Sequence, residues 1–510
     1  MQGIFSTSEV SWLLFSLVLV FSITTWAQNT GRMHGTVKDP TGASIPAAQI
    51  AVTNPASGLV RNASTDSAGA FVVPSLPIGT YNVEVKAQGF TTTNVKDLVL
   101  HIGEGLLVDV TMRVGQVQEQ VSVAAEAPLT DTLSPEVGNV IQEQRVQNLP
   151  LNGRNVLQLA LLAPGAAEPD PGNGIEKGSF TSGGFTVSIN GGRLDENEYL
   201  LDGVWDGIVY FNQQNILPTV DAVSEFRVIG TNADASRGFG HGGVIIYSTV
   251  SGGNNIHGKV WEFLRNDVLD ARNFFDRTRP PYRQSQFGAI VTGPVLLPGY
   301  NGKDRTHFMF SYEGLRIHKG LTALTTIPTS AEIGGDFSAD APIYDPLTTR
   351  PDPSNTGKFL RDPFPGNKIP SNRIASQSAF LASFFPLISQ GGVGNFVNNP
   401  TLINNRDQYN ARIDHSFSTH DQVFGRVTVA NFDGRDPLAS GVVFAAAPPF
   451  NPPSLPTTEG AFSRNVALGW THVFSSSVVN QFLFGFNRSR MPRDQRGPDF
   501  FGKFGSNCLA

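Results

Sequence analysis

At 510 residues the chain is long enough for two to four domains. Charged residues make up only 16% of it, and the 53 Gly and 36 Phe favour a β-rich protein with much uncharged surface. The net charge of −6 gives no electrostatic footprint for nucleic acid. The single cysteine, Cys508, excludes an intrachain disulfide framework and a cysteine-based zinc site.

The N-terminus is predicted to be a secretory signal peptide over residues 1–27. Its apolar run, WLLFSLVLVFSI, is shorter than the ~20 residues that a helix needs to cross a bilayer. Thr25 and Ala27 place small residues at −3 and −1 of a cleavage site, although the first ten residues lack Lys and Arg. No other run reaches transmembrane-helix length, so any membrane insertion is expected to use strands.

Residues 32–114 are predicted to form a small antiparallel β-sandwich, because short alternating strands recur between turn signals such as DPTG. The pattern G-x-V-x-D-x-x-G-x-x-I-P-x-A from Gly35, followed by LPIGTYNVEVKAQGF, resembles the carboxypeptidase-regulatory-like domain. His101 and Glu104 have an H-x-x-E zinc-ligand spacing. We interpret them instead as polar residues at a strand end, because no catalytic α/β domain surrounds them.

Residues 117–134 form a transition with one β-prone piece, Gln120 to Ala124. Two interpretations stay open for it, an ordinary linker strand and a peptide that contacts an energy-coupling partner.

Residues 115–255 are predicted to be a small α+β domain. It has a helix from about Asn155 to Ala163, a strand at 185–190, an alternating strand at 222–229 and an apolar strand at 244–250. The order LPLNGRN, ING-GR, YLLDGV, VSEFRV, GGVIIYSTVSGGNNIHG resembles the plug domain of TonB-dependent outer-membrane receptors. The resemblance is to the Oar-like group with an N-terminal carboxypeptidase-regulatory-like domain, and it implies plug-motif turns at Asn190, Gly191, Gly192, Asp202, Gly203, Gly242 and Gly243.

The glycines at 238, 240 and 243 spell the G-x-G-x-x-G dinucleotide fingerprint. That fingerprint requires a helix after the glycines, whereas VIIYSTV is β-branched and predicts a strand. We therefore interpret the cluster as a turn, and no catalytic residue, cofactor or metal site is predicted in the chain.

Residues 256–510 carry the alternation of a transmembrane β-barrel. Seven strands are counted, and the alternative is a soluble sandwich with aromatic inner faces. The predicted outward-facing sets are Phe308, Phe310 and Tyr312; Tyr409, Ala411 and Ile413; Val423, Val427 and Val429; Val466, Leu468 and Trp470; Phe482, Phe484 and Phe486. The segments FLRNDVLDARNFFD, SYEGLR and DQYNARIDHSFS resemble the same receptor group, and residues 317–406 are expected to form a long extracellular loop.

Plugged barrels have ~22 strands, so the chain is expected to be an N-terminal fragment of a longer barrel. The fold class is thus mainly β: a β-sandwich, an α+β plug and the first strands of an antiparallel barrel. The resemblance implies outer-membrane lipid and the TonB energy-coupling complex as partners, with the regulatory-like domain in the periplasm of a Gram-negative cell.

The function implied is energy-coupled uptake of a nutrient, such as a siderophore or an oligosaccharide, whose identity the sequence leaves open. The alternative is a secreted or surface-attached adhesin or glycan-binding module without transport. An enzyme ranks third, because no H-E-x-x-H, G-x-S-x-G or P-loop motif occurs.

Overall fold

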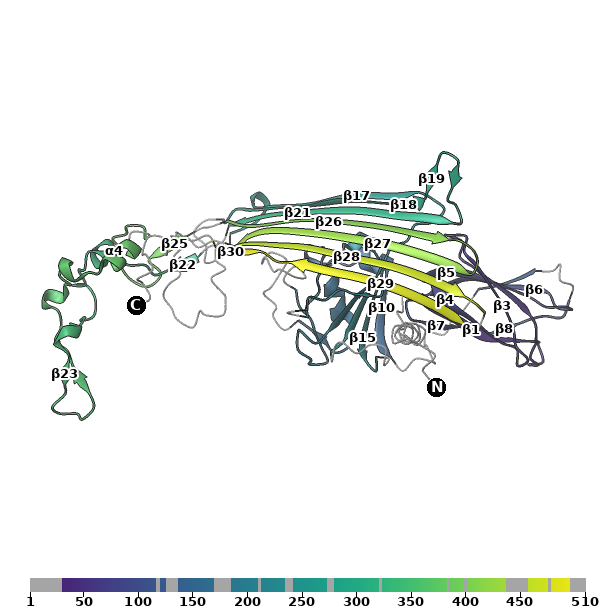
Figure 1. Ribbon diagram of the computed structural model, residues 1–510, viewed down its shortest axis with the longest axis horizontal. Helices are drawn as coiled ribbons and strands as arrows, with labels where there is room; N and C mark the ends of the chain where they lie inside the picture. The colour runs from purple at the N-terminus through teal and green to yellow at the C-terminus, as the bar shows by residue number, and fades with distance from the viewer. Residues whose placement is uncertain are drawn as a thin grey trace, which may run out of the picture.

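The computed structural model describes residues 30–115, 120–124, 136–168, 185–209, 212–233, 242–272, 279–320, 323–382, 385–398, 401–436, 457–475 and 478–495. A β-sandwich lies at one end of the long axis, and an α+β domain lies beneath a broad curved sheet (Figure 1). The predicted signal peptide and two glycines of the G-x-G-x-x-G cluster, Gly238 and Gly240, fall outside the described residues.

The first domain packs two sheets around one apolar core. One sheet has the order β4-β1-β7, with β8 also pairing with β1, and the other has the order β3-β2-β5-β6-β9. The strands are β1 Thr30–Lys38, β2 Gln49–Thr53, β3 Val60–Ser64, β4 Ala70–Pro77, β5 Gly79–Lys86, β6 Thr92–Leu100, β7 Gly105–Leu107, β8 Val110–Thr111 and β9 Gln120–Ala124.

The expectation of purely antiparallel pairing in this sandwich is wrong. β1 pairs in parallel with β7 and β8, and β6 pairs in parallel with β9. Parallel neighbours need a longer crossover than a hairpin, and the chain provides it between β1 and β7 and between β6 and β9. The β-prone piece at 120–124 is therefore the edge strand of the first domain's larger sheet.

The second domain, which we call the plug domain, is built on a five-stranded sheet with the order β10-β15-β16-β13-β14. Its helical pieces lie on one face of that sheet around the buried side chains of Val156, Leu157 and Leu159. The elements are β10 Val137–Gln142, α2 Glu143–Asn148, η1 Asn152–Arg154, η2 Val156–Leu162, β11 Ala166–Ala167, β12 Ser188–Ile189, β13 Glu198–Leu201, β14 Val204–Trp205, η4 Val220–Ala222, β15 Val223–Thr231 and β16 Val244–Thr249.

Two local predictions for this domain need correction. The helix predicted at about 155–163 is a 3₁₀ helix, η2, capped by the Asn155 side chain, which accepts from the backbone N–H of Leu157. β15 does not alternate between buried and exposed residues, since nearly all of it is buried. One face of β15 packs on the plug core through Phe226 and Val228, and Ile229 on the other face packs against Ile102 of the first domain.

The third part is a curved antiparallel sheet, which we call the wall. Its order is β17-β18-β21-β26-β27-β28-β29, which confirms the seven predicted strands. They are β17 His257–Asn266, β18 Tyr282–Pro294, β21 Thr306–Gly320, β26 Thr401–Ser416, β27 Asp421–Asp436, β28 Thr457–Val473 and β29 Val479–Arg490, and a short β30, Arg493–Gln495, also pairs with β28. In the described part of the chain β17 and β29 do not pair with each other.

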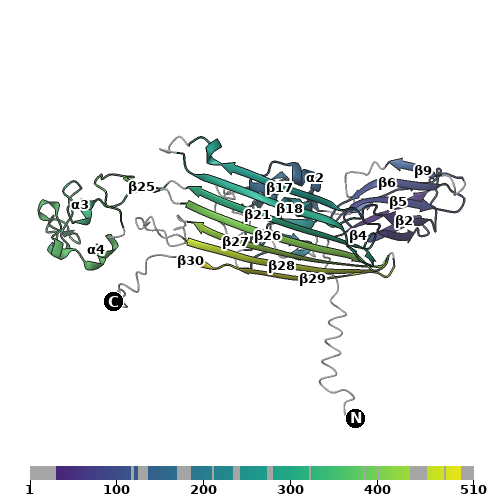
Figure 2. The ribbon, with the colours of Figure 1, turned by 90° about the horizontal axis from the view of Figure 1, so that it is seen from above.

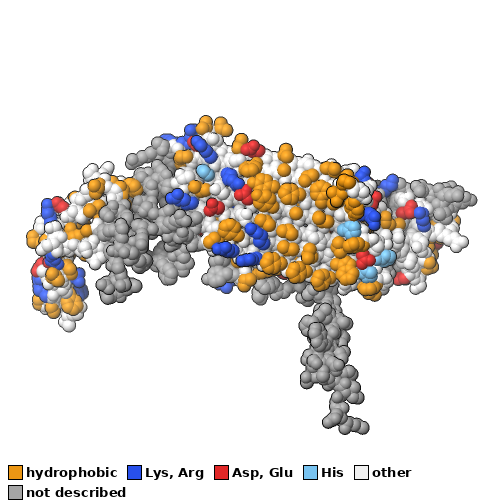
Figure 3. Space-filling view, turned by 45° about the horizontal axis from the view of Figure 1, so that its top comes forward, with side chains coloured by type: hydrophobic (Ala, Val, Ile, Leu, Met, Phe, Trp, Pro, Cys, Tyr) orange, Lys and Arg blue, Asp and Glu red, His pale blue; other side chains and the backbone are white. Residues whose placement is uncertain are grey.

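The two faces of the wall differ as the alternation predicts. Nine of the side chains predicted to face outward are between 42% and 57% exposed: Phe310, Tyr409, Ile413, Val427, Leu468, Trp470, Phe482, Phe484 and Phe486. Side chains from the inner face, such as Met309, Asn410 and Asn465, are at most 2% exposed because they face the plug domain. Figure 3 shows the outer face as an apolar band, with Lys and Arg gathered toward one end.

The ends of the wall are also different. Short turns join β26 to β27 and β28 to β29, and we call this the short-turn end; the first domain lies there (Figures 1 and 2). The opposite, long-loop end carries the connections 321–400 and 437–456. The predicted long loop is shorter than expected, because β21 runs to Gly320 and β26 begins at Thr401.

The segment between β21 and β26 is an ordered module and not an irregular loop. Two-stranded pairs hold its base and its tip, and its bidentate ion pairs include Arg373 with Asp345. Its elements are β22 Ala323–Thr325, α3 Ser330–Ile333, η6 Pro346–Thr348, β23 Arg350–Pro351, β24 Phe359–Leu360, η7 Pro365–Asn367, η8 Ser371–Arg373, α4 Ser376–Ala382 and β25 Phe396–Asn398. Throughout the described residues, no helix has the length and apolarity needed to cross a membrane.

Candidate functional site

The hairpin between β13 and β14 brings the plug domain against the wall. Its turn residues, Asp202 and Gly203, both have positive φ, +49° and +80°. Asp-Gly is a favoured pair for a two-residue hairpin turn with this backbone. The turn places the Asp202 side chain, which is fully buried, between the plug sheet and the inner face of the wall.

Asp202 is the centre of a buried ion cluster that joins the two domains. Its carboxylate accepts from the backbone N–H and the hydroxyl of Thr249, at 2.9 and 2.8 Å. From the wall, Arg412 Nη1 lies 3.1 Å and Arg426 Nε lies 2.6 Å from its oxygens. Burial would raise the pKa of Asp202, but the charges of Arg412 and Arg426 lower it below its ordinary value. The carboxylate is thus held ionised at neutral pH.

Arg426 also links Asp202 to polar groups further along the wall. Its Nη2 donates to Asn465 Oδ1 at 2.6 Å and to the Leu201 carbonyl at 3.2 Å. Asn465 in turn donates to Asp206, whose carboxyl group also accepts from the backbone N–H of Ile216, both at 3.2 Å. Burial raises the pKa of Asp206 to about 8, so this second carboxyl group is mainly protonated at neutral pH. Plug and wall therefore share one buried polar network.

A second ion cluster lies nearer the long-loop end of the same interface. Arg154, from the LNGRN segment, pairs with the buried carboxylate of Asp221, and Lys259 of β17 approaches the same carboxylate to 2.5 Å. The guanidinium of Arg154 also lies 5.5 Å from the ring centroid of Trp261 and 4.8 Å from that of Phe263. Two wall aromatics thus support a plug-domain cation by cation–π contact.

The other plug-motif residues are arranged in one compact turn region. Asn190 and Gly191 have positive φ, and the Asn190 side chain donates to the Gly230 carbonyl at 2.6 Å. A Cβ on Gly192 would lie 3.4 Å from the Gly242 Cα, and a Cβ on Gly243 would lie 2.4 Å from Ile189 Cδ1. The structure thus brings 190–192 together with 242–243, whereas Asp202 and Gly203 lie at the opposite end of the parallel β13–β16 pair.

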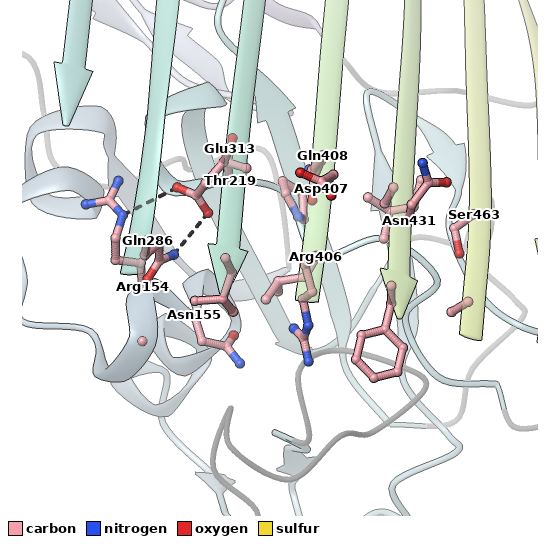
Figure 4. Close-up of a pocket in the computed structure, with 18 of the residues that line it drawn as sticks. Arg154, Asn155, Thr219, Gln286, Glu313, Arg406, Asp407, Gln408, Asn431 and Ser463 are labelled. Atoms are coloured by element: carbon pink, nitrogen blue, oxygen red, sulfur yellow. Dashed lines mark hydrogen bonds and ion pairs between the residues drawn. The ribbon is translucent and has the colours of Figure 1, made fainter. Parts of the chain in front are cut away.

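A polar cavity of about 90 Å³ opens between the plug domain and the wall on the long-loop side (Figure 4). The plug domain contributes 153–155 and 215–219, and the wall contributes residues of β18, β21, β26, β27 and β28. Besides Arg154 Nε, which lies 3.6 Å from Glu313 Oε2 in an ion pair, four buried polar atoms at this cavity lack a hydrogen-bond partner among the described residues: Arg406 Nη2, Gln408 Nε2, Thr219 Oγ1 and Asn215 Oδ1. Three of these atoms can donate, so the cavity suits a ligand rich in acceptor oxygens.

Sequence reasoning identified Asp202 as a turn residue but missed its ion partners, as well as Arg154 and the cavity. The H-x-x-E pair is not part of a metal site in the described residues, where no cluster of three or more His, Cys, Asp or Glu could hold an ion. His101 Nδ1 instead lies 2.6 Å from Glu225 Oε1 of the plug domain, and the His101 backbone N–H donates to Glu104 Oε2 at 2.7 Å.

Comparison with known proteins gives two family matches. A model of the outer membrane beta barrel domain matches residues 248–508, about half of the chain, and a model of the carboxypeptidase regulatory-like domain matches residues 32–113. The chain is also similar to the TonB-dependent transporter Oar of Myxococcus xanthus, with 27% identity over 296 residues. That match covers 54% of this chain and 26% of the transporter, so the chain spans about a quarter of this curated relative.

Among solved structures, the chain resembles the outer membrane transporter YddB from Escherichia coli, with 9% identity and a TM-score of 0.42. This match covers 69% of the chain and 38% of the transporter. The siderophore receptor PiuA from Acinetobacter baumannii matches with 13% identity and a TM-score of 0.36, over 70% of this chain and 45% of the receptor.

Proposed function

Because the chain belongs to the outer membrane beta barrel domain family, we propose that it is a plug-gated receptor for the uptake of a nutrient ligand. The observation that carries the proposal is the buried polar network between plug and wall, with the open polar cavity beside it. A plug held by polar bonds can be released without exposing a large apolar surface. The Myxococcus relative is a TonB-dependent transporter, and we propose that energy for the release likewise comes through TonB from the inner membrane.

The orientation follows from the connections of the wall. Outer-membrane barrels have short periplasmic turns and long extracellular loops. In the proposed orientation the long-loop end faces outward, with the cavity on the extracellular side of the plug and the first domain in the periplasm. Exposed aromatics at the short-turn end, such as Phe417 and Phe474, fit the interfacial girdle of such barrels.

The cavity supports a proposal for the ligand class. Its unpartnered donors come from a guanidinium, an amide and a hydroxyl group, and they match carboxylate, phosphate or sugar oxygens. We therefore propose an acceptor-rich nutrient, such as a chelated-iron complex or an oligosaccharide. A thermal-shift panel of such compounds on the purified full-length receptor would identify the ligand, and its uptake with and without an uncoupler would test the energy coupling.

The alternative of a secreted binding module predicts a different location. Its apolar wall face would lie in water, where large exposed apolar patches are disfavoured. An immunoblot with an antibody to residues 32–114 separates the two functions. The receptor predicts a band in the outer-membrane fraction that migrates differently when unheated and heated, and the secreted module predicts a soluble band without that shift.

Replacing Arg406 by alanine is expected to weaken binding of the panel ligand about tenfold, which corresponds to about 1.4 kcal/mol. The substitution removes a charged donor at the cavity. Its Nη2 atom has no hydrogen-bond partner among the described residues, so it is available to the ligand. Isothermal titration calorimetry measures the change. The exposed Arg435, at the same end of the wall, is the matched control, and equal affinities of both alanine variants would rule the cavity out as the binding site.

A further inference from the structure

The first domain touches the plug domain and the wall at the same time. It lies at the short-turn end of the wall, where both other parts of the chain reach its surface (Figure 1). The two contacts use different segments of the domain, residues 101–104 for the plug domain and residues 54–58 for the wall. Neither the carboxypeptidase-regulatory-like match nor the barrel match assigns a role to this arrangement.

The contact with the plug domain is buried and highly specific. Glu225 accepts from the backbone N–H of Ile102 at 2.9 Å and lies 2.6 Å from His101 Nδ1. Arg227 donates to the Ile102 carbonyl with one amino group and to Glu136 Oε2 at 2.9 Å with the other. Glu225 and Arg227 are 6% and 8% exposed, so the loop 101–104 covers both.

An apolar cluster strengthens this contact. Ile102 is 1% exposed and packs with Ile229, Val244 and Ile246 of the plug sheet, with Ile78 at the edge of the cluster. These plug residues lie on the face of β15 and β16 opposite the plug core. The first domain thus supplies the second layer that keeps this sheet face out of water.

The contact with the wall is smaller and polar. The Ala56 carbonyl accepts at 2.8 Å from the backbone N–H of Asn254, which lies in the short segment that joins β16 of the plug domain to β17 of the wall. Asn254 Oδ1 in turn accepts from the backbone N–H of Asp304 at 2.7 Å. At a second point, Gln481 of β29 donates to the Thr30 hydroxyl at 3.2 Å. With no buried apolar cluster among its described residues, this contact is the weaker of the two.

We propose that the first domain is a periplasmic clasp that is fixed to the plug sheet and holds the plug domain to the rim of the wall. Because the plug contact is buried and the rim contact is polar, the rim contact opens first and the domain travels with the plug. This last step rests on the proposed plug movement, whereas the simultaneous docking does not. The partner of the 101–104 loop is therefore the plug surface formed by Glu225, Arg227 and Ile229.

The docking has a built-in pH dependence. The charged groups facing His101 are Glu225 and Arg227 from the plug sheet and Glu104 from its own loop. The hydrogen bond with Glu225 raises the pKa of His101 above its ordinary value of 6.5. Its contribution to docking is therefore complete below pH 6.5 and is lost as the pH rises through the raised pKa.

A disulfide between the clasp and the rim tests the proposal without any ligand. A Cβ built on Gly253 lies 3.9 Å from the Ala56 Cβ, within the ~3.5–4.5 Å that a disulfide spans. That Cβ would also lie 2.9 Å from the Ala56 carbonyl oxygen, so the turn must shift slightly. The pair Ala56→Cys and Gly253→Cys is placed in the full-length protein with Cys508→Ser. Isolated outer membranes are reduced, the reductant is removed, and a two-electron thiol oxidant such as diamide is added. Disulfide formation is then followed on non-reducing gels.

We expect rapid disulfide formation in the parent pair, and at least fivefold slower formation after Glu225→Ala, because the clasp is then no longer fixed to the plug sheet. His101→Ala, which leaves the plug domain untouched, is also expected to slow disulfide formation. Because every thiol reacts faster as the pH rises, the pH dependence is measured as the ratio of the parent rate to the His101→Ala rate. This ratio is expected to be larger at pH 6 than at pH 8. Asp195→Ala, at an exposed plug carboxylate, should leave the rate unchanged. No disulfide in the parent pair, or equal rates in the parent and both docking variants, would overturn the clasp, whatever the uptake assays show.

Discussion

Replacing Asp202 by asparagine is expected to destabilise the plug domain by about 3–5 kcal/mol, the usual cost of removing one partner from a buried ion pair. The amide keeps the shape of the side chain, but it removes the charge and replaces one of the two acceptor oxygens by a donating NH2 group. Arg426 then loses the carboxylate 2.6 Å away, while Arg412 keeps Asp414 at 2.8 Å. Hydrogen exchange of the β13–β16 amides in the full-length protein measures the effect, with exchange expected to rise more than 100-fold.

Asp195 provides the matched control for this change, since it is an exposed carboxylate of the same domain. Its replacement by asparagine should alter exchange by less than a factor of about five, because exposed charges contribute less than about 1 kcal/mol. If the two variants exchange alike, the buried cluster does not hold the plug to the wall, and the gating proposal loses its structural basis.

Asp206 is expected to make the plug domain less stable as the pH rises from 5 to 8. Burial raises its pKa to about 8, so between the ordinary value of 3.8 and pH 8 the folded plug binds one more proton than the unfolded chain. Stability therefore falls with increasing pH, by at most about 1.4 kcal/mol per pH unit. Asp206→Asn removes this titration and should be more stable than the parent at pH 8.

The measurement for Asp206 is hydrogen exchange of residues 206–217 at several pH values, corrected for the intrinsic rate. Asp202 does not make stability depend on pH between 5 and 8, because its lowered pKa confines its titration to acid pH. The raised pKa of His101 also makes stability fall with increasing pH. Hydrogen exchange of residues 101–104 measures this contribution separately. If exchange of residues 206–217 depends on pH equally in the parent and in Asp206→Asn, Asp206 is ionised over the whole range from pH 5 to 8.

The wall could be predicted from the sequence because alternation is a local property of each strand. Polar and apolar side chains such as Asn465 and Leu468 face opposite sides of β28, and the strand pattern encodes this directly. β15 could not be predicted in the same way. Its second face is covered by the loop 101–104, which lies more than one hundred residues earlier in the chain. The sequence of the strand itself therefore does not indicate that this face is buried.

The candidate site was predictable only at its turns. Asp202-Gly203 is a local turn signal, but its ion partners Arg412 and Arg426 lie more than two hundred positions away. An arginine on the inner face of a barrel strand commonly lines a polar lumen, so the strand pattern alone does not pair it with one carboxylate. The cavity depends on five strands and two plug loops together, which is why no single motif indicates it.

In the proposed mechanism the plug must move away from the wall to admit ligand. A Cβ on Gly485 of β29 would lie 3.2 Å from the Val204 Cβ of the plug domain, slightly below the ~3.5–4.5 Å span of a disulfide. The test is uptake of the panel ligand by cells carrying Val204→Cys and Gly485→Cys in the Cys508→Ser full-length protein. We expect uptake to be blocked while the disulfide is intact and restored by a reductant, with each single cysteine variant active throughout. Full uptake through the cross-linked protein would contradict it.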